Sequence, residues 1–473
     1  MENIETDICV IGDGAGWLSV AAGASQMGAA VVLLESGKVG GDCLNYGCVP
    51  SKAMIAAGHA AELFRTSEPF GVAQQESVID FAKVHKHVHD VIGAIKPNDS
   101  VERNEGLGVH VIQAAGKFIG RREVVAGDAR IKAKYFVVAT GSSAVVPPIP
   151  GLADVHYLTN ETVFDRTECP EHLLVIGGGP IGCELAQAHR RLGAKATILE
   201  MFGILAKDDP EAADVVRRQL QREGISVREN IKVSGVSASD GGVTVEIECD
   251  DGAETITGSH VLVAAGRRPN LDGLDLDAAG IAHSPQGIEV DARLRTTNKR
   301  VFAIGDAAGA LQFTHVAGYH AGIVIRNALF KLPAKATYRA IPRVTYTDPE
   351  LANVGLTEAE AKDRLSGDIR ILRWPIAEND RAQAERRTEG FVKVIADRKG
   401  RIHGVCIVGP HAGELIMPWV LAVENGLKVG AMASVVAPYP TLSEVSKRAS
   451  GSYFTASLFS ERTKKLVRFL MRF

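Results

Sequence analysis

One pattern occurs twice in this chain of 473 residues and restricts its fold more than any other. A short apolar run leads into a glycine-rich turn, a helical stretch and a second apolar run that ends in a glutamate. It covers residues 7–35 and again residues 173–200. Strand, turn, helix and strand in this order form the dinucleotide-binding unit of parallel α/β folds. The repeat therefore predicts an α/β chain with two nucleotide-binding domains.

The first copy has Gly12 and Gly14 in its turn and Glu35 at the end of its second strand. Such glycines let the backbone approach a pyrophosphate at the helix N-terminus, and the acid accepts a hydrogen bond from a ribose hydroxyl. The third fingerprint position holds the bulky Trp17, and Asp13 adds a carboxylate near the expected phosphates. We therefore expect this copy to bind its nucleotide more weakly than a complete fingerprint would.

The second copy has all three fingerprint glycines, Gly177, Gly179 and Gly182, and Glu200 ends its second strand. A carboxylate at that place binds the 2′-hydroxyl of the adenosine ribose of NAD and repels the 2′-phosphate of NADP. No arginine follows in residues 201–205. The sequence therefore favours NADH over NADPH.

Residues 40–52 read Gly-Gly-Asp-Cys-Leu-Asn-Tyr-Gly-Cys-Val-Pro-Ser-Lys and contain two cysteines, Cys43 and Cys48. Their spacing is too loose for a zinc knuckle, and no second pair completes four ligands, so we expect no metal site. Four intervening residues can bring two sulfurs together at the start of a helix, where the helix dipole and Lys52 favour a thiolate. The alternative is a pair of inert, buried cysteines.

This stretch resembles the redox-disulfide motif of the flavin-dependent pyridine-nucleotide disulfide oxidoreductases, G-G-T-C-L-N-x-G-C-x-P-S-K, with Asp42 in place of threonine. The resemblance extends over nearly the whole chain. It implies FAD, a nicotinamide nucleotide and a Cys43–Cys48 disulfide. By the same resemblance, Cys48 is the thiolate next to the flavin and Cys43 exchanges with the acceptor.

The resemblance also implies roles for other positions. Glu184 matches a glutamate that pairs with the lysine after the motif, here Lys52, and Asp306 matches the residue that holds the ribityl hydroxyls. The expected FAD contacts are Gly12, Gly14, Glu35, Lys52, Gly116, Thr140, Gly141, Ser142 and Asp306, and the expected NAD contacts are Gly177, Gly179, Gly182, Glu200 and Gly266.

The resemblance, together with a Pro-rich linker at residues 147–151, divides the chain. It implies two Rossmann-like nucleotide-binding domains and a C-terminal α+β dimerisation domain, so a homodimer completes the active site in trans. The expected segments are an FAD-binding domain at 1–150, an NAD(P)-binding domain at 151–272, a return segment of the FAD-binding domain at 273–340 and the dimerisation domain at 341–473. Within the last segment we expect strands over 390–396 and 402–408 and then one helix from Ala412 to Asn425.

One catalytic position departs from the family. Relatives that reduce disulfides read H-x-H-P-T-x-x-E, whereas residues 437–444 retain Glu444 and place Tyr439 where the general base stands. A phenol with a pKa of about 10 is a poor base at neutral pH, and loss of a base typically costs ~10²–10⁴-fold in rate. Mercuric reductases also have a tyrosine near this position, but residues 466–473 lack their C-terminal cysteine pair.

The expected function is therefore an FAD-dependent, NADH-preferring oxidoreductase that passes electrons through the disulfide to a disulfide or other thiol-reactive acceptor, a small molecule or a small protein. Three enzymatic alternatives remain open: a mercuric-reductase-like enzyme, a quinone or electrophile reductase, and a flavin reductase that does not use the disulfide. A non-enzymatic redox sensor is a further alternative.

The composition of the chain indicates which partners and which cellular compartment to expect. The formal net charge of −3 gives no basic field for nucleic acid. The seven cysteines are scattered apart from the central pair, and there is neither a signal-peptide pattern nor an apolar run of membrane-spanning length, so we expect a cytoplasmic protein. Residues 460–473 mix basic and bulky apolar side chains, and they either lie on an anionic membrane surface or pack on the dimer.

Overall fold

The computed structural model describes residues 1–12, 14–250, 252–309, 311–365 and 368–473. The chain forms two compact units. The first contains residues 1–177, 188–195 and 232–337, and the second contains residues 178–187, 196–231 and 338–473. The four segment boundaries expected from the sequence stay predictions.

The main sheet of the first unit has seven strands. Its order is β3 (Val109–Ile112), β2 (Val31–Leu34), β1 (Glu2–Ile11), β6 (Ala129–Val138), β5 (Glu123–Ala126) and β4 (Lys117–Gly120), and β19 (Val301–Ala303) also pairs with β6. Strands β1, β2, β3, β6 and β19 run parallel, and β4 and β5 are antiparallel. The predicted parallel sheet is therefore confirmed. Strand β1 starts before the predicted Asp7, because Glu2 already pairs with Ala129.

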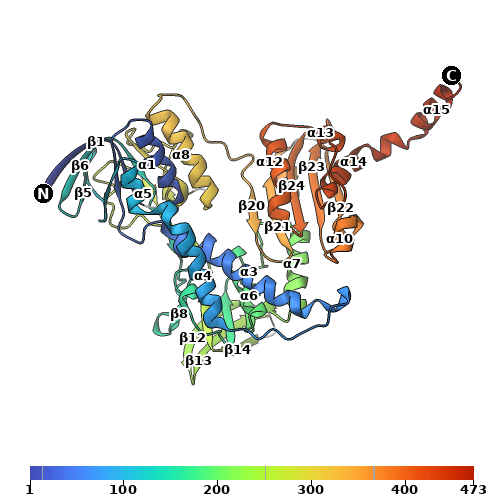
Figure 1. Ribbon diagram of the computed structural model, residues 1–473, viewed down its shortest axis with the longest axis horizontal. Coiled ribbons are helices and arrows are strands. Elements are labelled where there is room, and N and C mark those ends of the chain that lie inside the picture. The colour runs from blue at the N-terminus through green and yellow to red at the C-terminus, as the bar shows by residue number, and fades with distance from the viewer. Residues whose placement is uncertain (13, 251, 310, 366–367) are drawn as a thin grey trace. The chain divides into compact units, whose positions relative to one another are not determined.

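The helix that the sequence predicts after the first glycine-rich turn is present. Helix α1 (Ala15–Gln26) follows Gly14 directly and packs against α8 (Thr314–Ala328), as Figure 1 shows. The residues of β2 are all buried, as expected for a strand with both faces covered. Asp13 lies outside the described residues, and so does the side chain of Trp17, so the expectation about the strength of nucleotide binding stays a prediction.

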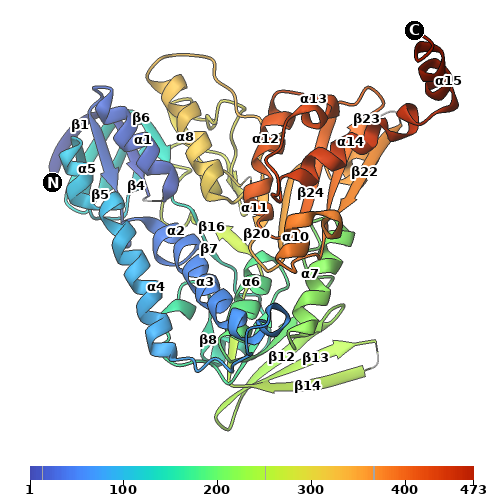
Figure 2. The same cartoon turned by 45° about the vertical axis from the view of Figure 1, so that its right-hand side comes forward.

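The rest of the first unit carries the cysteine segment and several smaller sheets. Its helices are α2 (Gly41–Asn45), α3 (Cys48–Arg65), α4 (Phe81–Ile95) and α5 (Val101–Gly106). Strands β8 (Tyr157–Leu158) and β9 (His172–Ile176) run parallel to β15 (His260–Val263). The antiparallel strands are β7 (Ser142–Ala144) with β16 (Arg267–Pro269), β17 (His283–Ser284) with β18 (Gly287–Ile288), and the three-stranded sheet of β12 (Lys232–Ser239), β13 (Gly242–Cys249) and β14 (Gly252–Gly258) seen in Figure 2.

The second unit is built on an antiparallel sheet. Its order is β20 (Arg343–Thr345), β21 (Glu350–Gly355), β24 (Ile402–Gly409), β23 (Phe391–Asp397) and β22 (Ile369–Pro375). Further elements are α6 (Pro180–Arg191) and β10 (Lys195–Leu199), which lie partly in the first unit, β11 (Ser226–Arg228), α7 (Pro210–Arg222), α9 (Glu358–Arg364), α10 (Asp380–Ala384), α13 (Val429–Ser434) and α14 (Glu444–Leu458). This sheet with its helices gives the expected α+β fold of the C-terminal region.

One predicted helix of the second unit is wrong in detail. A single helix was expected from Ala412 to Asn425, but the structure has α11 (Ala412–Leu415) and α12 (Met417–Glu424). Pro418 lies at the start of α12. Proline has no N–H to donate and is tolerated in the first turn of a helix, so a new helix starts there.

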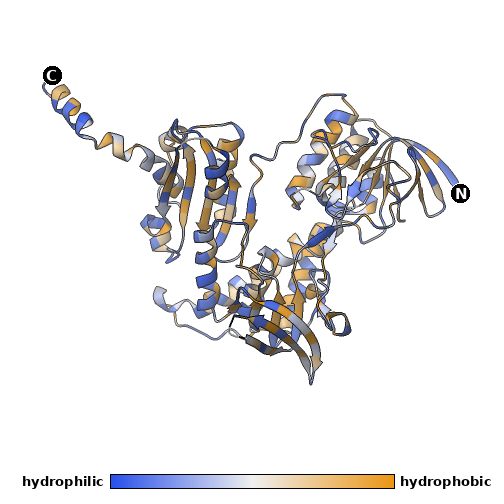
Figure 3. Cartoon of the chain, turned by 180° about the vertical axis from the view of Figure 1, so that it is seen from behind, coloured by the Kyte–Doolittle hydropathy of each residue, from blue (hydrophilic) through white to orange (hydrophobic). Residues whose placement is uncertain are grey.

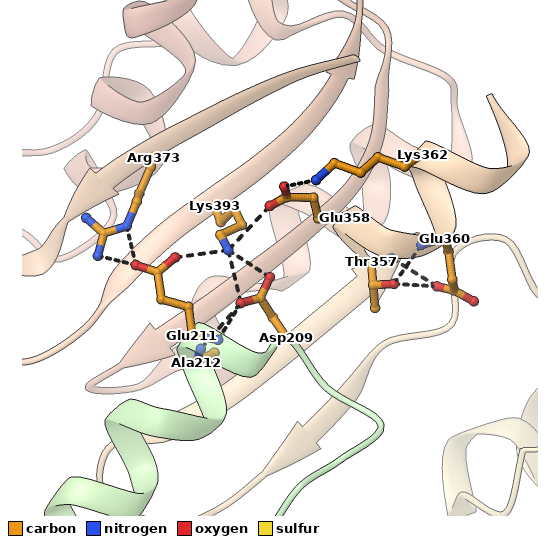
Figure 4. Close-up of polar contacts among 9 residues, drawn as sticks. All are labelled: Asp209, Glu211, Ala212, Thr357, Glu358, Glu360, Lys362, Arg373 and Lys393. Carbon is orange, nitrogen blue, oxygen red and sulfur yellow. Dashed lines mark hydrogen bonds and ion pairs between the residues drawn. The ribbon is translucent and has the colours of Figure 1, made fainter. Parts of the chain in front are cut away.

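An ion cluster around the buried Lys393 and Asp209 holds α7 to the sheet within the second unit (Figure 4). Lys393 Nζ on β23 lies 2.8 Å from Asp209 Oδ2 and 3.0 Å from Glu211 Oε2. Asp209 also caps α7, because its side chain accepts hydrogen bonds from the N–H groups of Glu211 and Ala212. Arg373 of β22 binds the other oxygen of Glu211. The charges of the lysine and its carboxylates compensate one another, as buried charges require.

The chain ends in α15 (Glu461–Leu470), an amphipathic helix with no buried residue. Figure 3 shows apolar and polar positions mixed along it. Over the part of the chain that the structure describes, no helix is both long and apolar enough to cross a bilayer.

Candidate active site

The two motif cysteines lie at the junction of two helices. Cys43 belongs to the short helix α2, and Cys48 is the first residue of α3, so the predicted helix start is confirmed. The N-cap of α3 is Gly47, which has no side chain to cap the helix, and the first turn of α3 contains no acidic residue. The positive end of α3 therefore acts on the Cys48 sulfur without competition from a capping side chain.

The surroundings shift the pKa values of the two thiols in opposite directions. A hydrogen bond from Cys43, a second one with Thr314 and the charge of Lys52 outweigh burial and lower the pKa of Cys48 to about 6. Cys48 Sγ lies 3.4 Å from Thr314 Oγ1. The hydrogen bond to Cys48 is also the main cause that raises the pKa of Cys43. In the reduced pair, Cys48 is thus a thiolate at neutral pH and Cys43 keeps its proton.

Lys52 and Glu184 were expected to pair, and the structure places them in different units. Lys52 lies on α3, in the turn after Cys48. Glu184 is buried on α6, and its Oε1 accepts a hydrogen bond of 2.9 Å from the backbone N–H of Tyr346. The predicted pair joins the two units and stays a prediction.

The first glycine turn has the form that a dinucleotide requires. Gly12 has φ +101°, and a Cβ there would lie 2.6 Å from the carbonyl oxygen of Ala139, so only glycine is accommodated. Gly14 is the cap of α1, whose first turn has no acidic residue. Gly116 packs against the ends of β1 and β2, where a Cβ would lie 2.9 Å from Leu34. The N–H groups at the start of α1 therefore fit the pyrophosphate of FAD.

The acid at the end of β2 is already hydrogen-bonded within the chain. Glu35 Oε1 accepts a hydrogen bond from the N–H of Gly37. A carboxylate oxygen has more than one lone pair, so this bond orients Glu35 and leaves capacity for a ribose hydroxyl. The position fits the expected role.

Thr140, Gly141, Ser142 and Asp306 come together in the first unit. Ser142 Oγ donates to Asp306 Oδ2 at 2.6 Å, although the two residues are distant in sequence. Thr140 Oγ1 donates to the carbonyl oxygen of Asn270 at 2.7 Å, and Asn270 N–H donates to the carbonyl of Gly141. Burial raises the pKa of Asp306. Hydroxyl donors such as those of a ribityl chain would compensate a carboxylate in this setting.

Sequence reasoning gave no role to two residues at this place. Arg267 donates from Nε to Ser142 Oγ at 2.8 Å and lies 3.1 Å from Asp42 Oδ1. Asn160 Nδ2 donates to the same oxygen of Asp42 at 3.1 Å. The signal that could have indicated them is Asp42 itself, because a carboxylate in place of threonine requires donors.

The second glycine turn fits the pyrophosphate of a nicotinamide nucleotide. A Cβ at Gly177 would lie 2.4 Å from the carbonyl oxygen of Ala264. Among the described residues, apart from the immediate chain neighbours, a Cβ at Gly179 or Gly266 would meet no atom within 4 Å. Gly182 lies in the first turn of α6, which carries no acidic residue. The space beside Gly179 therefore lets a phosphate approach the backbone.

Glu200 follows β10 and is held by the backbone on both oxygens. Oε2 accepts from the N–H of Gly178 at 2.6 Å, and Oε1 accepts from the N–H of Phe202 at 3.0 Å. This fixes the carboxylate in the second unit at the end of the strand, as the sequence pattern predicts.

Tyr439 has a partner that the sequence did not indicate. Its hydroxyl donates to Asp380 Oδ2 at 2.8 Å, and 70% of the residue is exposed. The hydrogen bond to Asp380 raises the pKa of Tyr439. Glu444 starts α14 and lies 3.7 Å from Arg448. Tyr439 therefore keeps its proton at neutral pH even more firmly than an ordinary phenol, and a protonated phenol cannot act as a general base.

The comparisons with known proteins show to which family the chain belongs. Residues 6–321 match the pyridine nucleotide-disulphide oxidoreductase family, and residues 341–450 match its dimerisation domain, which supports a homodimer. The chain is 36% identical to a dihydrolipoyl dehydrogenase of Geobacillus stearothermophilus over 94% of this chain and 96% of that protein. It is 34% identical to a mercuric reductase of Bacillus cereus over 94% of this chain and 71% of that protein.

Solved structures show the same fold. A copper(II) complex of the HOCl-induced flavoprotein disulfide reductase RclA from Escherichia coli has a TM-score of 0.83 and 27% identity, covering 93% of this chain and 99% of that chain. LpdA from Mycobacterium tuberculosis has a TM-score of 0.86 and 28% identity, covering 95% of this chain and 99% of that chain. With both family domains matched in order along its length, the chain belongs to the pyridine nucleotide-disulphide oxidoreductase family and is an FAD-dependent pyridine nucleotide-disulfide oxidoreductase.

Proposed function

We propose that this enzyme uses NADH to reduce an acceptor that reacts with a thiolate and needs no proton relay. The observation that carries the proposal is the place of Cys48 at the first residue of α3, with its sulfur 3.4 Å from Thr314 Oγ1 and hydrogen-bonded to Cys43, where the pKa of the thiol is lowered. The expected site residues, from the glycine turns to Asp306, are part of this proposal.

When bound, FAD supplies the two-electron chemistry that connects a reduced nicotinamide to the disulfide. The chain contributes the groups around the cysteines. Lys52 and the N-terminus of α3 stabilise the negative charge on Cys48, and Thr314 donates a hydrogen bond to it. Cys43, with its raised pKa, holds the proton until the acceptor reacts.

For a disulfide acceptor, Cys43 must lose its proton and attack one sulfur, and the other sulfur leaves as a thiol after taking up a proton. Cys48 then attacks Cys43 and releases the second thiol, which restores the Cys43–Cys48 disulfide. Overall, NADH, one proton and the disulfide give NAD⁺ and two thiols. The first step needs a base, and the exposed Tyr439 with its raised pKa is a poor one. Quinones and other electrophiles that do not depend on this proton transfer are therefore better acceptors.

A second candidate acceptor is a soft, thiol-binding metal ion. Two adjacent thiols, one of them acidic, provide the sulfur ligands that such ions prefer. Relatives at 34% identity are named mercuric reductase, and RclA has been solved as a copper(II) complex. The metal ion would be the substrate, reduced by two electrons from the cysteine pair as the disulfide forms again, or by one electron each for two copper(II) ions.

We also infer that NADH is preferred to NADPH. The support is Glu200, whose carboxylate is held by two backbone N–H groups and would repel a 2′-phosphate. Replacement of Glu200 by serine should raise kcat/KM for NADPH relative to NADH. An unchanged ratio would count against this role.

The proposal also covers the contribution of each subunit to the active site of its partner, and the cellular location of the enzyme. Tyr439 and Glu444 would line the mouth of the partner's cysteine site in the homodimer. We place the enzyme in the cytoplasm, where its buried free thiols stay reduced.

The exposed amphipathic helix α15 is suited to an anionic bilayer surface. Sedimentation with phosphatidylglycerol vesicles, lost on deletion of residues 460–473, would support the contact, and a loss of dimerisation would instead assign α15 to the dimer.

The decisive experiment is an acceptor panel with NADH: lipoamide, glutathione disulfide, a quinone, mercuric ion, copper(II) and oxygen. The wild-type enzyme is compared with Cys43→Ser and Cys48→Ser. We expect quinone or metal reduction to exceed glutathione disulfide and lipoamide reduction, and both variants to lose it. Full activity of Cys43→Ser would favour a flavin reductase that does not use the disulfide. No turnover with any acceptor would favour a redox sensor.

A further inference from the structure

Asp42, which stands directly before Cys43, is the clearest departure of the redox motif from its family pattern. Its Oδ1 lies 3.1 Å from Arg267 Nη2 and accepts a hydrogen bond of 3.1 Å from Asn160 Nδ2. Asn160 is buried and also donates to the carbonyl oxygen of Tyr46, in the same segment, at 3.3 Å. Two donors from outside the motif thus hold residues 41–48, the segment from the start of α2 to the start of α3 that carries both cysteines and is called the cysteine segment below.

Arg267 extends this contact to a second part of the site. It lies on β16, which pairs with β7, and 14% of its side chain is exposed. Its Nε donates to Ser142 Oγ at 2.8 Å, and its Nη2 donates to the carbonyl oxygen of Ser142 at 2.6 Å. Ser142 Oγ in turn donates to Asp306 Oδ2. All of these residues belong to the first unit.

We propose that Asp42 and Arg267 are a positioning ion pair that fixes the cysteine segment to Ser142 at the start of β7 and sets the reduction potential of the cysteine pair by opposing charges. The proposal rests on the proposed function, because it assumes that Cys43 and Cys48 form a redox disulfide.

The signs of the two charges follow from their positions. The carboxylate of Asp42 disfavours negative charge on either sulfur: it adds to the rise in the pKa of Cys43 and opposes the lowering of the pKa of Cys48. Lys52 acts in the opposite direction on Cys48. Asp306 is the other acid of the network, and the charge of Asp42 contributes to its raised pKa. Arg267 partly neutralises both acids, because it pairs with Asp42 and its charge opposes the rise in the pKa of Asp306.

A cysteine pair whose thiolate is less stable is a stronger reductant, because the reduced form is then less favoured. Removal of the carboxylate in Asp42→Asn should therefore make the pair easier to reduce. Removal of the guanidinium in Arg267→Gln leaves the carboxylate uncompensated and should make the pair harder to reduce. The double variant removes both charges and should return toward the wild type.

The test is the equilibrium of the FAD-loaded dimer with reduced and oxidised dithiothreitol. The fraction of reduced Cys43 and Cys48 is read by alkylation and peptide mass spectrometry. We expect the equilibrium constant to change about tenfold, which is about 30 mV, in opposite directions for the two single variants. The double variant should lie within about threefold of the wild type, by partial cancellation of the two charges.

Two further variants make the result specific. Asp42→Thr restores the family residue without the charge and should behave like Asp42→Asn. Asp272→Asn removes a carboxylate that pairs at 2.8 Å with the neighbouring Arg268 on the exposed surface, and it should leave the potential unchanged. Shifts of both single variants in the same direction, or no shift in Asp42→Asn and Asp42→Thr, would overturn the proposal. A wild-type enzyme with no Cys43–Cys48 disulfide at any ratio would instead overturn the proposed function.

Discussion

The sulfur of Cys48 lies 3.4 Å from the hydroxyl oxygen of Thr314, the first residue of α8. The two residues are distant in sequence, so the hydrogen bond joins the cysteine segment to α8, the helix that packs against α1. It is one of the contacts that lower the pKa of Cys48 to about 6. The acidity of the thiol therefore depends on a residue outside the redox motif.

Replacement of Thr314 by valine should raise the pKa of Cys48. The loss of one hydrogen bond to a charged acceptor corresponds to about one pKa unit, or about 1.4 kcal/mol. The alkylation rate of Cys48 in the reduced enzyme, measured with iodoacetamide from pH 5 to pH 9, should rise at a higher pH than in the wild type. Thr314→Ser retains the hydroxyl and is the matched control. Identical curves for valine and wild type would show that the hydroxyl does not act on the thiolate.

The buried lysine of the second unit should be essential for stability. Lys393 is 7% exposed and Asp209 is 5% exposed, and the two are in direct contact (Figure 4). Lys393→Met would leave the buried carboxylate of Asp209 without its counter-charge, which costs about 3–5 kcal/mol. Urea unfolding, followed by the emission of Trp374 and Trp419 in the same unit, measures the change.

Lys362→Met provides the control for this change. Lys362 Nζ lies 2.8 Å from Glu358 Oε1, but 63% of the lysine side chain is exposed. Exposed pairs contribute about 0–1 kcal/mol, so this variant should unfold close to the wild type. Equal effects of the two variants would contradict the buried role of Lys393.

A buried histidine should make the first unit sensitive to acid. His320 is fully buried on α8, accepts a hydrogen bond at Nδ1 from the N–H of Gly305, and burial lowers its pKa to about 4 from 6.5. Between these two values the unfolded chain binds more protons than the folded one, so stability falls as the pH decreases. The loss is about 2 kcal/mol at pH 5, at about 1.4 kcal/mol per pKa unit.

His320→Gln should remove this part of the acid sensitivity. An amide oxygen can accept from Gly305, and the side chain does not titrate. Urea unfolding followed by circular dichroism at pH 7 and pH 5 gives the difference in stability for each protein. A difference as large in the variant as in the wild type would show that other groups cause the acid sensitivity.

The sequence predicted the elements whose pattern is local. The apolar runs, the glycine turns and the cysteine spacing each describe a few neighbouring residues, and the structure confirms the strands and helices expected there. Helix α4 was not predicted although its signals are local too, since Asp80 caps it by accepting from the N–H of Lys83 and apolar residues recur along one face. The alternating residues of β13 were a similar signal for a strand.

The contacts that set the chemistry could not be predicted in the same way. Tyr439 and Asp380 meet across a separation of 59 residues, and Arg267 reaches Ser142 across 125 residues. Lys393 interrupts an apolar strand, and the acid that compensates its charge, Asp209, is 184 residues away. Such pairs depend on tertiary packing, which no local pattern encodes.

The two glycines of the second turn should respond differently to the same substitution. At Gly177, φ is +113° and a Cβ would lie 2.4 Å from the carbonyl oxygen of Ala264, so Gly177→Ala should lower the free energy of unfolding by roughly 1–3 kcal/mol. At Gly179, a Cβ would meet no atom of the described residues within 4 Å other than those of its chain neighbours. Gly179→Ala should therefore leave the stability of the nucleotide-free protein within about 1 kcal/mol. It should still raise KM for NADH at least about tenfold, because the methyl group occupies the space of the pyrophosphate. Urea unfolding and NADH kinetics on both variants measure these effects, and an unchanged KM in Gly179→Ala would place the nucleotide elsewhere.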